Sequence, residues 1–130
     1  MSAETVFLTV DVVLNIHRRM IEEFGGDGSI RDRGLMEAAI AMPRQRFDGK
    51  LLHENVAEQA AAYLYHICSN HAFVDGNKRT ALAAAELFLL LNETQLLATN
   101  DELYDLTMGV ARGSVDKKTA TVFFQEHVRY

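Results

Sequence analysis

The sequence has few of the features that mark secreted or membrane-embedded chains. It has a single cysteine, Cys68, so an intramolecular disulfide is impossible and a reducing cytoplasm is the expected compartment. The most apolar stretch, from Ala81 to Leu91, is interrupted by Glu86 and is too short to cross a bilayer. The opening residues, MSAETVFLTV, lack the basic start and the long apolar core of a signal peptide. We therefore expect a cytoplasmic protein that does not associate with membranes.

An excess of positive charge is also lacking. The formal net charge is −5. Because sequence-independent binding to nucleic acid needs a basic protein face, we expect no direct nucleic-acid partner. ATP is not excluded, because its phosphates need only a local cluster of cations. The 130 residues are 48% hydrophobic and contain no repeat or low-complexity stretch. These observations predict one globular domain over residues 1–130.

The chain has one proline, Pro43, and between its scattered glycines the apolar residues recur at helical spacing. Thr9 and Asp32 are expected to cap two helices, the first ending at Gly25-Gly26 and the second before Pro43. A third helix is expected over 53–70 and a fourth over 77–91. Asn100 and Ser114 are expected caps of two closing helices. Only residues 5–8 read as extended.

The fourth expected helix has almost no polar face. Ten of its positions between 81 and 91 are alanine, leucine or phenylalanine. A helix that is apolar all round is buried on all sides, so this helix is expected at the centre of the molecule. The predicted class is all-α: a single compact bundle of about six helices around a buried central helix.

The loop before this helix, with the sequence HAFVDGNKRT over residues 71–80, carries the residues suited to phosphate chemistry. It opens the helix at its N-terminus, where unpaired N–H groups and the helix dipole favour an anion. Asn77, Lys78 and Arg79 add a neutral donor, a point charge and a planar fork, which together suit phosphate oxygens. Gly76 allows the backbone to approach a ligand closely. These residues predict an anion site.

Three further residues of this loop complete the expected site. His71 has the side chain whose ordinary pKa suits proton removal from a hydroxyl near neutral pH. Asp75 is a hard oxygen ligand for a magnesium ion that bridges phosphates. Phe73 is expected to anchor the loop by burying its ring. A purely structural histidine and a solvated Lys-Arg pair remain the alternative interpretation of the same residues.

The loop resembles the signature of the Fic/Doc family, written HxFx[D/N]xN followed by Gly-Arg or Lys-Arg. Fic-type nucleotidyltransferases carry HPFxxGNGRxxR, whereas Doc-type toxins are closer to HxFxDxNKRTA. Ala72, Lys78 and Leu82 stand where the Fic form has proline, glycine and its second arginine, and all three favour the Doc form. The similarity continues upstream in Ile16-His17, in Phe24-Gly-Gly and in the segments over 30–35 and 41–43.

The resemblance implies an enzyme with the Fic/Doc fold and a Doc-like toxin function. His71 would be the catalytic base, Asp75 would hold Mg²⁺, and residues 76–79 would cradle the phosphates of ATP, with Lys78 and Arg79 counted among the catalytic residues. By resemblance, the γ-phosphate would go to a hydroxyl of a translation factor, elongation factor Tu, and arrest translation. An AMP or other nucleotidyl transferase is the first alternative, and a non-catalytic binding module with the same fold is the second.

The resemblance also implies regulation by a second protein. Fic proteins are often restrained by a helix with the motif [S/T]xxxE[G/N], and no Ser or Thr of this chain has a Glu four residues later; Thr121, for example, is followed by Gln125. An antitoxin whose disordered tail folds into a groove beside the active site is therefore the expected partner. Arg31, Arg44 and Arg46 are the candidate groove residues.

Other conspicuous residues receive structural interpretations. His17 lies on the apolar stripe of the first helix and His66 lies within the third, so both are expected to be structural. His53-Glu54 begins like a zinc-protease motif but lacks the second histidine, because position 57 is alanine. The glycines at 25–28 are followed by no Lys-Ser or Lys-Thr pair, so they are interpreted as a helix end rather than a phosphate-binding P-loop.

Overall fold

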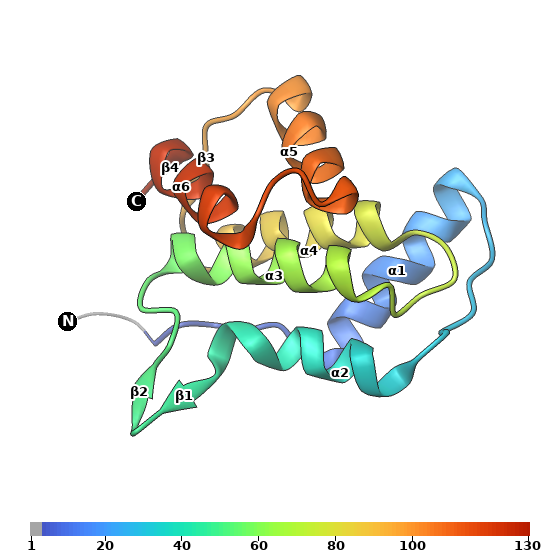
Figure 1. The fold of residues 1–130 in the computed structure, drawn as a ribbon, viewed down its shortest axis with the longest axis horizontal. Coiled ribbons are helices and arrows are strands. Elements are labelled where there is room, and N and C mark those ends of the chain that lie inside the picture. Colours follow the sequence, from blue (N-terminus) through green and yellow to red (C-terminus); the bar gives the residue numbers. More distant parts are fainter. Residues whose placement is uncertain (1–3) are drawn as a thin grey trace.

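A computed structural model describes residues 4–130 of the chain and confirms the all-α class. The described residues form six α-helices, a short 3₁₀ helix and four two-residue strands (Figure 1). The helices are α1 Val10–Phe24, α2 Arg33–Ala41, α3 Val56–Asn70, α4 Asn77–Leu91, α5 Asn100–Arg112 and α6 Lys117–His127; the 3₁₀ helix, η1, is Met42–Arg44. Residues 1–3 lie outside the described part of the chain. They belong to the predicted domain over 1–130 and to the N-terminal stretch in which no signal peptide was found.

The first two helices begin where their caps predict. The Thr9 hydroxyl accepts a hydrogen bond from Val12 N–H, and the Asp32 carboxylate accepts one from Leu35 N–H, which satisfies one free donor at each helix start. Gly25 ends α1 at a φ of 86°, and its N–H donates to Ile21 O. The glycine pair is therefore a helix end, as predicted.

Three other helix starts differ from the prediction. Helix α3 begins at Val56 rather than at residue 53, because the Asn55 side chain accepts from Glu58 N–H and caps it there. The cap of α5 is Thr99 and not Asn100; Thr99 and Glu102 form a reciprocal capping box. Helix α6 is capped by Asp116 rather than by Ser114. In each case another residue able to cap the helix lies within three positions of the expected start, and its local hydrogen bonds fix the observed start.

The central helix of the molecule is α3, which corrects the expectation for α4. Helix α3 contacts α2, α4, α5 and α6, and lies between α2 on one side and α5 and α6 on the other (Figure 1). Its alanines at 57, 60, 61 and 62 are fully buried, and their small size lets neighbouring helices approach from several sides. Helix α4 is buried along Ala81, Ala84, Ala85, Phe88 and Leu89. At its end, however, Leu90 is 72% exposed.

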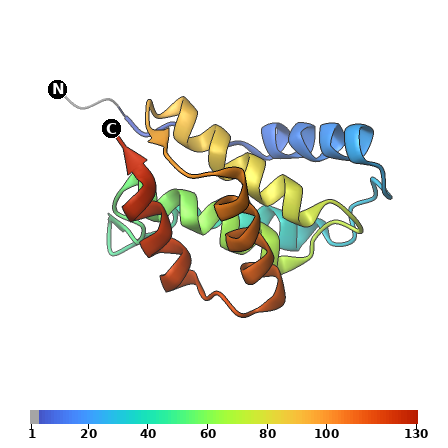
Figure 2. The same cartoon turned by 90° about the horizontal axis from the view of Figure 1, so that it is seen from above.

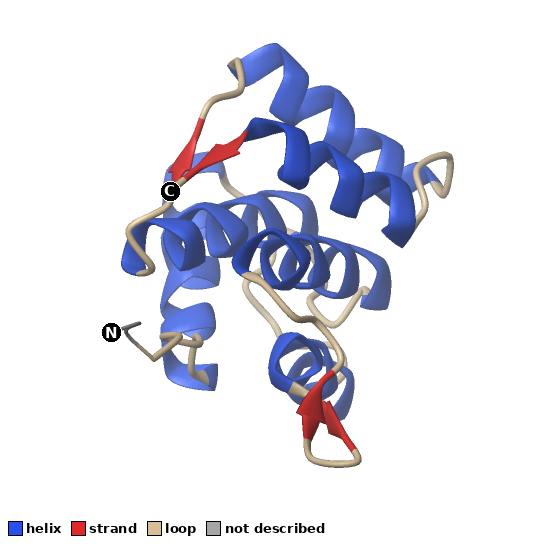
Figure 3. Ribbon diagram, turned by 90° about the vertical axis from the view of Figure 1, so that its left-hand side faces the viewer, coloured by secondary structure: helices blue, strands red, loops and turns tan. Residues whose placement is uncertain are grey.

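Two small antiparallel strand pairs lie outside the helices and were not predicted. Strands β1 Arg46–Phe47 and β2 Lys50–Leu51 form a hairpin, whereas β3 Gln95–Leu96 pairs with β4 Val128–Arg129 across the intervening helices α5 and α6. Figure 3 shows them at separate places on the helical body. Residues 5–8 join no sheet, as expected, although Leu8 N–H donates to the buried Tyr63 hydroxyl at 2.8 Å. Within the described residues, no helix combines the length and the apolarity that a membrane span requires.

Candidate active site

The loop over residues 71–76 connects the end of α3 with the start of α4 and lies beside the end of α1 (Figures 1 and 2). Phe73 is 2% exposed, which confirms it as the anchor of the loop. Its ring stacks on His17 of α1 with ring centroids 3.7 Å apart. On the backbone, Phe73 forms an antiparallel bridge with Ile30. The loop is therefore held in place by the core and by the segment between α1 and α2.

His17 is a buried, hydrogen-bonded histidine, as predicted, and its partner is this loop. Its Nε2 lies 2.8 Å from Asp75 O, so the ring carries a proton on that nitrogen and donates it to the carbonyl. The next residue, Gly76, has a φ of 85°, and a Cβ there would lie 3.3 Å from both His17 Cδ2 and Ile21 Cδ1. Gly76 thus permits a left-handed turn packed closely against α1.

His71 occupies an unusual backbone position. It follows the last residue of α3 in the left-handed region, with φ 50° and ψ 43°, and its side chain is exposed. Non-glycine residues are held in this region at a cost of about 1 kcal/mol or more, and such residues concentrate at functional sites. The turn ends α3 and leaves the imidazole accessible from solvent.

Asp75 is an exposed carboxylate held from one side. Its Oδ2 accepts a hydrogen bond from Asp27 N–H at 2.8 Å, and a Cβ on Gly26 would lie only 3.0 Å from the Asp75 Cβ. Nucleotide-bound Mg²⁺ commonly uses one or two carboxylates together with phosphate oxygens and water. The described residues contain no group of three or more His, Cys, Asp or Glu side chains arranged for a metal. A single carboxylate at this position fits a metal that arrives with phosphates.

Helix α4 begins without a capping side chain. Its N-cap is Gly76, and its first intrahelical hydrogen bond runs from Thr80 N–H to Gly76 O at 3.0 Å. The N–H groups of residues 77–79 therefore have no acceptor within the helix. Lys78 and Arg79 are exposed on this first turn. The dipole, the N–H groups and the two cations together suit an anion.

The side chain of Asn77 is engaged with the loop itself. Its Oδ1 accepts from Phe73 N–H at 3.1 Å and its Nδ2 donates to Phe73 O at 2.9 Å. These two bonds staple the loop across four residues. The amide therefore shapes the site, and only its second N–H hydrogen and the Asn77 backbone N–H are left for a phosphate.

The three arginines expected to line a partner groove are not brought together. Arg31 N–H donates to Ala72 O at 2.8 Å, so this residue lies next to the loop. Arg44 ends η1 and Arg46 begins β1, both near the start of α3, whereas the loop follows the end of α3. The expectation that Arg44 and Arg46 lie beside the site is therefore wrong, because α2 carries the chain to the opposite end of α3.

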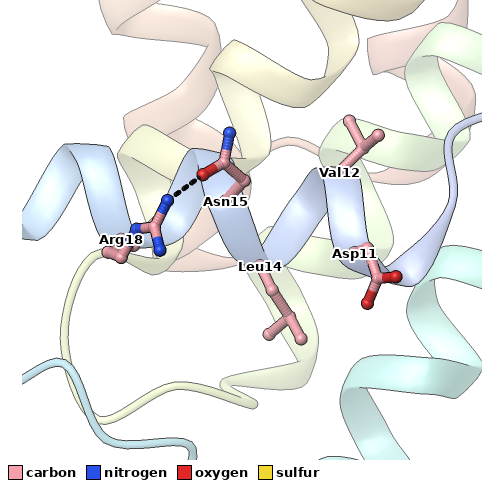
Figure 4. A pocket seen from close by; sticks show the side chains of 5 residues that line it. All are labelled: Asp11, Val12, Leu14, Asn15 and Arg18. Carbon is pink, nitrogen blue, oxygen red and sulfur yellow. Dashed lines mark hydrogen bonds between the residues drawn. The ribbon is translucent and has the colours of Figure 1, made fainter.

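A surface hollow of about 550 Å³ lies along α1, lined by Asp11, Val12, Leu14, Asn15 and Arg18 (Figure 4). None of these residues belongs to the loop over 71–80. Arg18 is the one basic side chain in the lining, and it donates a hydrogen bond to Asn15 Oδ1. The hollow therefore lacks the cluster of cations that a second phosphate site needs.

The other two histidines considered from the sequence lie apart from this chemistry. His66 is partly buried and His53 is buried, and desolvation lowers the pKa of both, that of His66 to about 4. Lys117 at the start of α6 lowers both pKa values further. His66 therefore faces α6 rather than the loop, in agreement with a structural role.

Sequence reasoning missed three residues at the site: Phe24, Asp27 and Ile30. Asp27 and Ile30 act through backbone groups, so their side-chain chemistry gave no signal. Phe24 is an apolar residue at the end of α1, yet its side chain is half exposed there. The sequence indicated the exposure of Phe24 only through its position directly before the Gly25-Gly26 helix end.

The fold and the loop define an all-α protein in which a histidine and a carboxylate precede an uncapped, cationic helix start. The sequence profile of the Fic/DOC family matches residues 7–89. Toxin Doc of Mycolicibacterium smegmatis is 47% identical over 78 residues, which is 60% of this chain and 60% of that protein. Protein kinase doc of Escherichia phage P1 is 34% identical over 111 residues, covering 83% of this chain and 84% of that protein. The chain belongs to the Fic/DOC family.

Proposed function

We propose that this protein is a Doc-like toxin that transfers the γ-phosphate of ATP to a hydroxyl of a protein. The observation that carries the proposal is the segment over 71–80, in which His71 and Asp75 directly precede the uncapped start of α4 with its exposed Lys78 and Arg79. The names of the two relatives, a toxin and a protein kinase, support the same conclusion. The alignment with the toxin spans less than two thirds of that protein.

The residues divide the reaction between them. His71 removes the proton from the attacking hydroxyl, whose oxygen forms a bond to the γ-phosphorus while the bond to the β-phosphate oxygen breaks and ADP leaves. Asp75 would hold Mg²⁺, and the metal would supply positive charge that stabilises the phosphates. Lys78, Arg79 and the N–H groups of the first α4 turn stabilise the charge that moves onto the leaving oxygens.

Lys78 is the residue that favours phosphate over nucleotide transfer. It is exposed on the first turn of α4, where Fic-type nucleotidyltransferases have a glycine that leaves the backbone open. A lysine side chain at this point occupies space and adds a positive charge, which favours a different pose of the triphosphate. If the γ-phosphate rather than the α-phosphate faces His71, a phosphoryl group is transferred instead of AMP.

We propose a translation factor, elongation factor Tu, as the target, and arrest of translation in the cytoplasm as the result. We also propose that an antitoxin restrains the enzyme in trans, since the chain has no glutamate motif that pairs with Arg79. The exposed Arg31, which is tied to the loop through Ala72, is the groove residue that remains beside the site. Expression of the chain alone should arrest growth, and co-expression of the protein encoded next to it should relieve the arrest.

Substitution of the base tests the catalytic assignment. His71→Ala should lower transfer by about a hundredfold to ten-thousandfold and abolish growth arrest at equal expression. His127→Ala is the matched control, because His127 lies on α6 and bonds Phe123 and Glu102 rather than the loop. A His71→Ala protein that still arrests growth would remove His71 from the mechanism.

Calorimetry tests the phosphate and metal assignments. Mg²⁺-dependent ATP binding should weaken sharply in Asp75→Ala and in Arg79→Ala, because each change removes charge stabilisation at the phosphates. Unchanged binding in both variants would place the nucleotide elsewhere on the molecule.

A further inference from the structure

Arg79 has an aromatic partner at the end of α1. Its guanidinium carbon lies 4.2 Å from the centroid of the Phe24 ring, which is the distance of a cation–π contact. Phe24 is the last residue of α1, and its side chain is 52% exposed. A half-exposed aromatic ring at a helix end contributes little to a core, so the contact with Arg79 is what this ring provides.

The contact holds Arg79 without occupying its hydrogen-bond donors. A guanidinium group stacks through its flat face, whereas its five N–H groups point outward in the plane. Among the residues that the structure describes, Arg79 forms no ion pair. A carboxylate partner would consume the donors that a phosphate needs, and an aromatic partner leaves them available.

The end of α1 adds an electrostatic reason for this arrangement. The C-terminal end of a helix carries partial negative charge, which a nearby cation stabilises. Helix α1 has no basic residue in its own last turn. Arg79, which comes from α4 and lies over the last residue of α1, supplies a positive charge at that position.

The same chain segment also holds the second charged group of the site. Two residues after Gly25, the N–H of Asp27 donates to Asp75 Oδ2 at 2.8 Å. The backbone of Gly26 passes so close to Asp75 that a Cβ would lie 3.0 Å from the Asp75 Cβ. Residues 24–27 therefore contact both Arg79 and Asp75, which lie on either side of the start of α4.

We propose that Phe24 is a positioning residue that orients Arg79 toward the phosphates of the bound nucleotide through this cation–π contact. The proposal rests on the proposed function, because it takes the phosphates of ATP as the ligand of Arg79. It predicts that the ring, and not merely an apolar side chain, is required at position 24.

The first test reads the position of Arg79 in the protein without nucleotide. In a nuclear magnetic resonance spectrum, the Nε–Hε signal of Arg79, assigned by its loss in Arg79→Lys, should be shifted by the ring current of Phe24. Phe24→Leu should return the signal to the value of a free arginine, and Phe24→Tyr should retain the shift. An unshifted signal in the unmodified protein overturns the proposal, whether or not the protein binds ATP.

The second test reads the consequence for the ligand. Mg²⁺–ATP binding should weaken about two- to fivefold in Phe24→Leu, the range that corresponds to an exposed cation–π contact. Phe24→Tyr should bind as the unmodified protein does. Phe47→Leu is the matched control, because Phe47 is an exposed ring in β1, near the opposite end of α3 from the loop.

A double-mutant cycle distinguishes action through Arg79 from direct contact with the nucleotide. If Phe24 acts through Arg79, Phe24→Leu should change binding by less than about 1.5-fold when introduced into Arg79→Ala, since the coupled partner is already gone. A full two- to fivefold loss in that background would mean that the ring contacts the nucleotide itself, which contradicts the proposal. Absence of ATP binding in the unmodified protein would instead count against the proposed function, and the spectrum would still decide whether Phe24 positions Arg79.

Discussion

Substitution of Asn77 distinguishes a role in holding the loop together from a role in binding a ligand. Its side chain makes two hydrogen bonds to the backbone of Phe73, at 3.1 and 2.9 Å. Each such bond contributes about 0.5–1.5 kcal/mol to stability, so Asn77→Ala should lower the free energy of unfolding by about 1–3 kcal/mol. This loss should appear without any nucleotide, because both partners belong to the protein.

Denaturation in guanidinium chloride at pH 7, without nucleotide, measures this free energy directly. Asn70→Ala is the matched control: Asn70 ends α3 and makes one exposed bond to Leu35 O at 3.2 Å, so its loss should be below about 1 kcal/mol. Asn77→Asp retains the acceptor for Phe73 N–H but directs a second oxygen at Phe73 O, so it should also destabilise the protein. If Asn77→Ala unfolds like the unmodified protein while its ATP binding falls, Asn77 is a ligand contact and the loop-staple interpretation is refuted.

Two further predictions concern the surroundings of the loop. Gly76→Ala should lower the free energy of unfolding by about 1–2 kcal/mol, because an L-residue at a φ of 85° is strained and its Cβ would crowd His17. Gly49→Ala is the control, because Gly49 has a similar φ of 79° but open space around it. A larger fall in melting temperature for Gly76→Ala than for Gly49→Ala therefore measures the crowding alone. Desolvation lowers the pKa of His66 from 6.5 to about 4, so the folded protein binds fewer protons than the unfolded chain and should lose stability as the pH falls from 6.5 toward 4. This difference in the pKa of His66 limits the loss of folding free energy to about 3 kcal/mol. Partial exposure of the ring to solvent reduces the expected loss to about 1–2 kcal/mol. Denaturation of His66→Gln across this pH range should show a weaker dependence, and an equally steep one would remove His66 as the cause.

Local signals in the sequence predicted the helices well because they act over a few residues. Thr9 and Asp32 cap α1 and α2 through side-chain bonds three residues long, and Gly25 ends α1 through its own backbone freedom. At α5 the local signal was present but overlooked: Thr99 is followed three residues later by Glu102, the capping-box spacing that Asn100 lacks.

The position of each helix in the bundle could not be read in the same way. The apolar run in α4 predicted a central helix, yet α3 is central because its alanines allow close packing on several faces. Periodicity reports how apolar a helix face is, and it does not report how many neighbours cover it. The location of Arg44 and Arg46 was also predicted wrongly. It depends on the direction in which α2 carries the chain, which the sequence pattern does not report.

The candidate site was predictable as a set of residues and not as a set of contacts. His71 and Asp75 lie in the loop and Lys78 and Arg79 lie on the helical turn that follows it, so their proximity follows from the chain itself. The partners of these residues come from α1 and the segment after it, about fifty positions away in the sequence. Only the structure shows that Phe24 lies under Arg79 and that Asp27 N–H holds Asp75.

Labelled ATP can show whether the segment that opens α4 transfers a phosphoryl group. The purified protein is incubated with Mg²⁺, a lysate of susceptible cells and ATP that carries radioactive phosphorus at either the γ or the α position. We expect γ-label to reach a protein band, α-label not to reach it, and His71→Ala to eliminate the signal. Incorporation of α-label would contradict phosphoryl transfer and make the protein a nucleotidyl transferase.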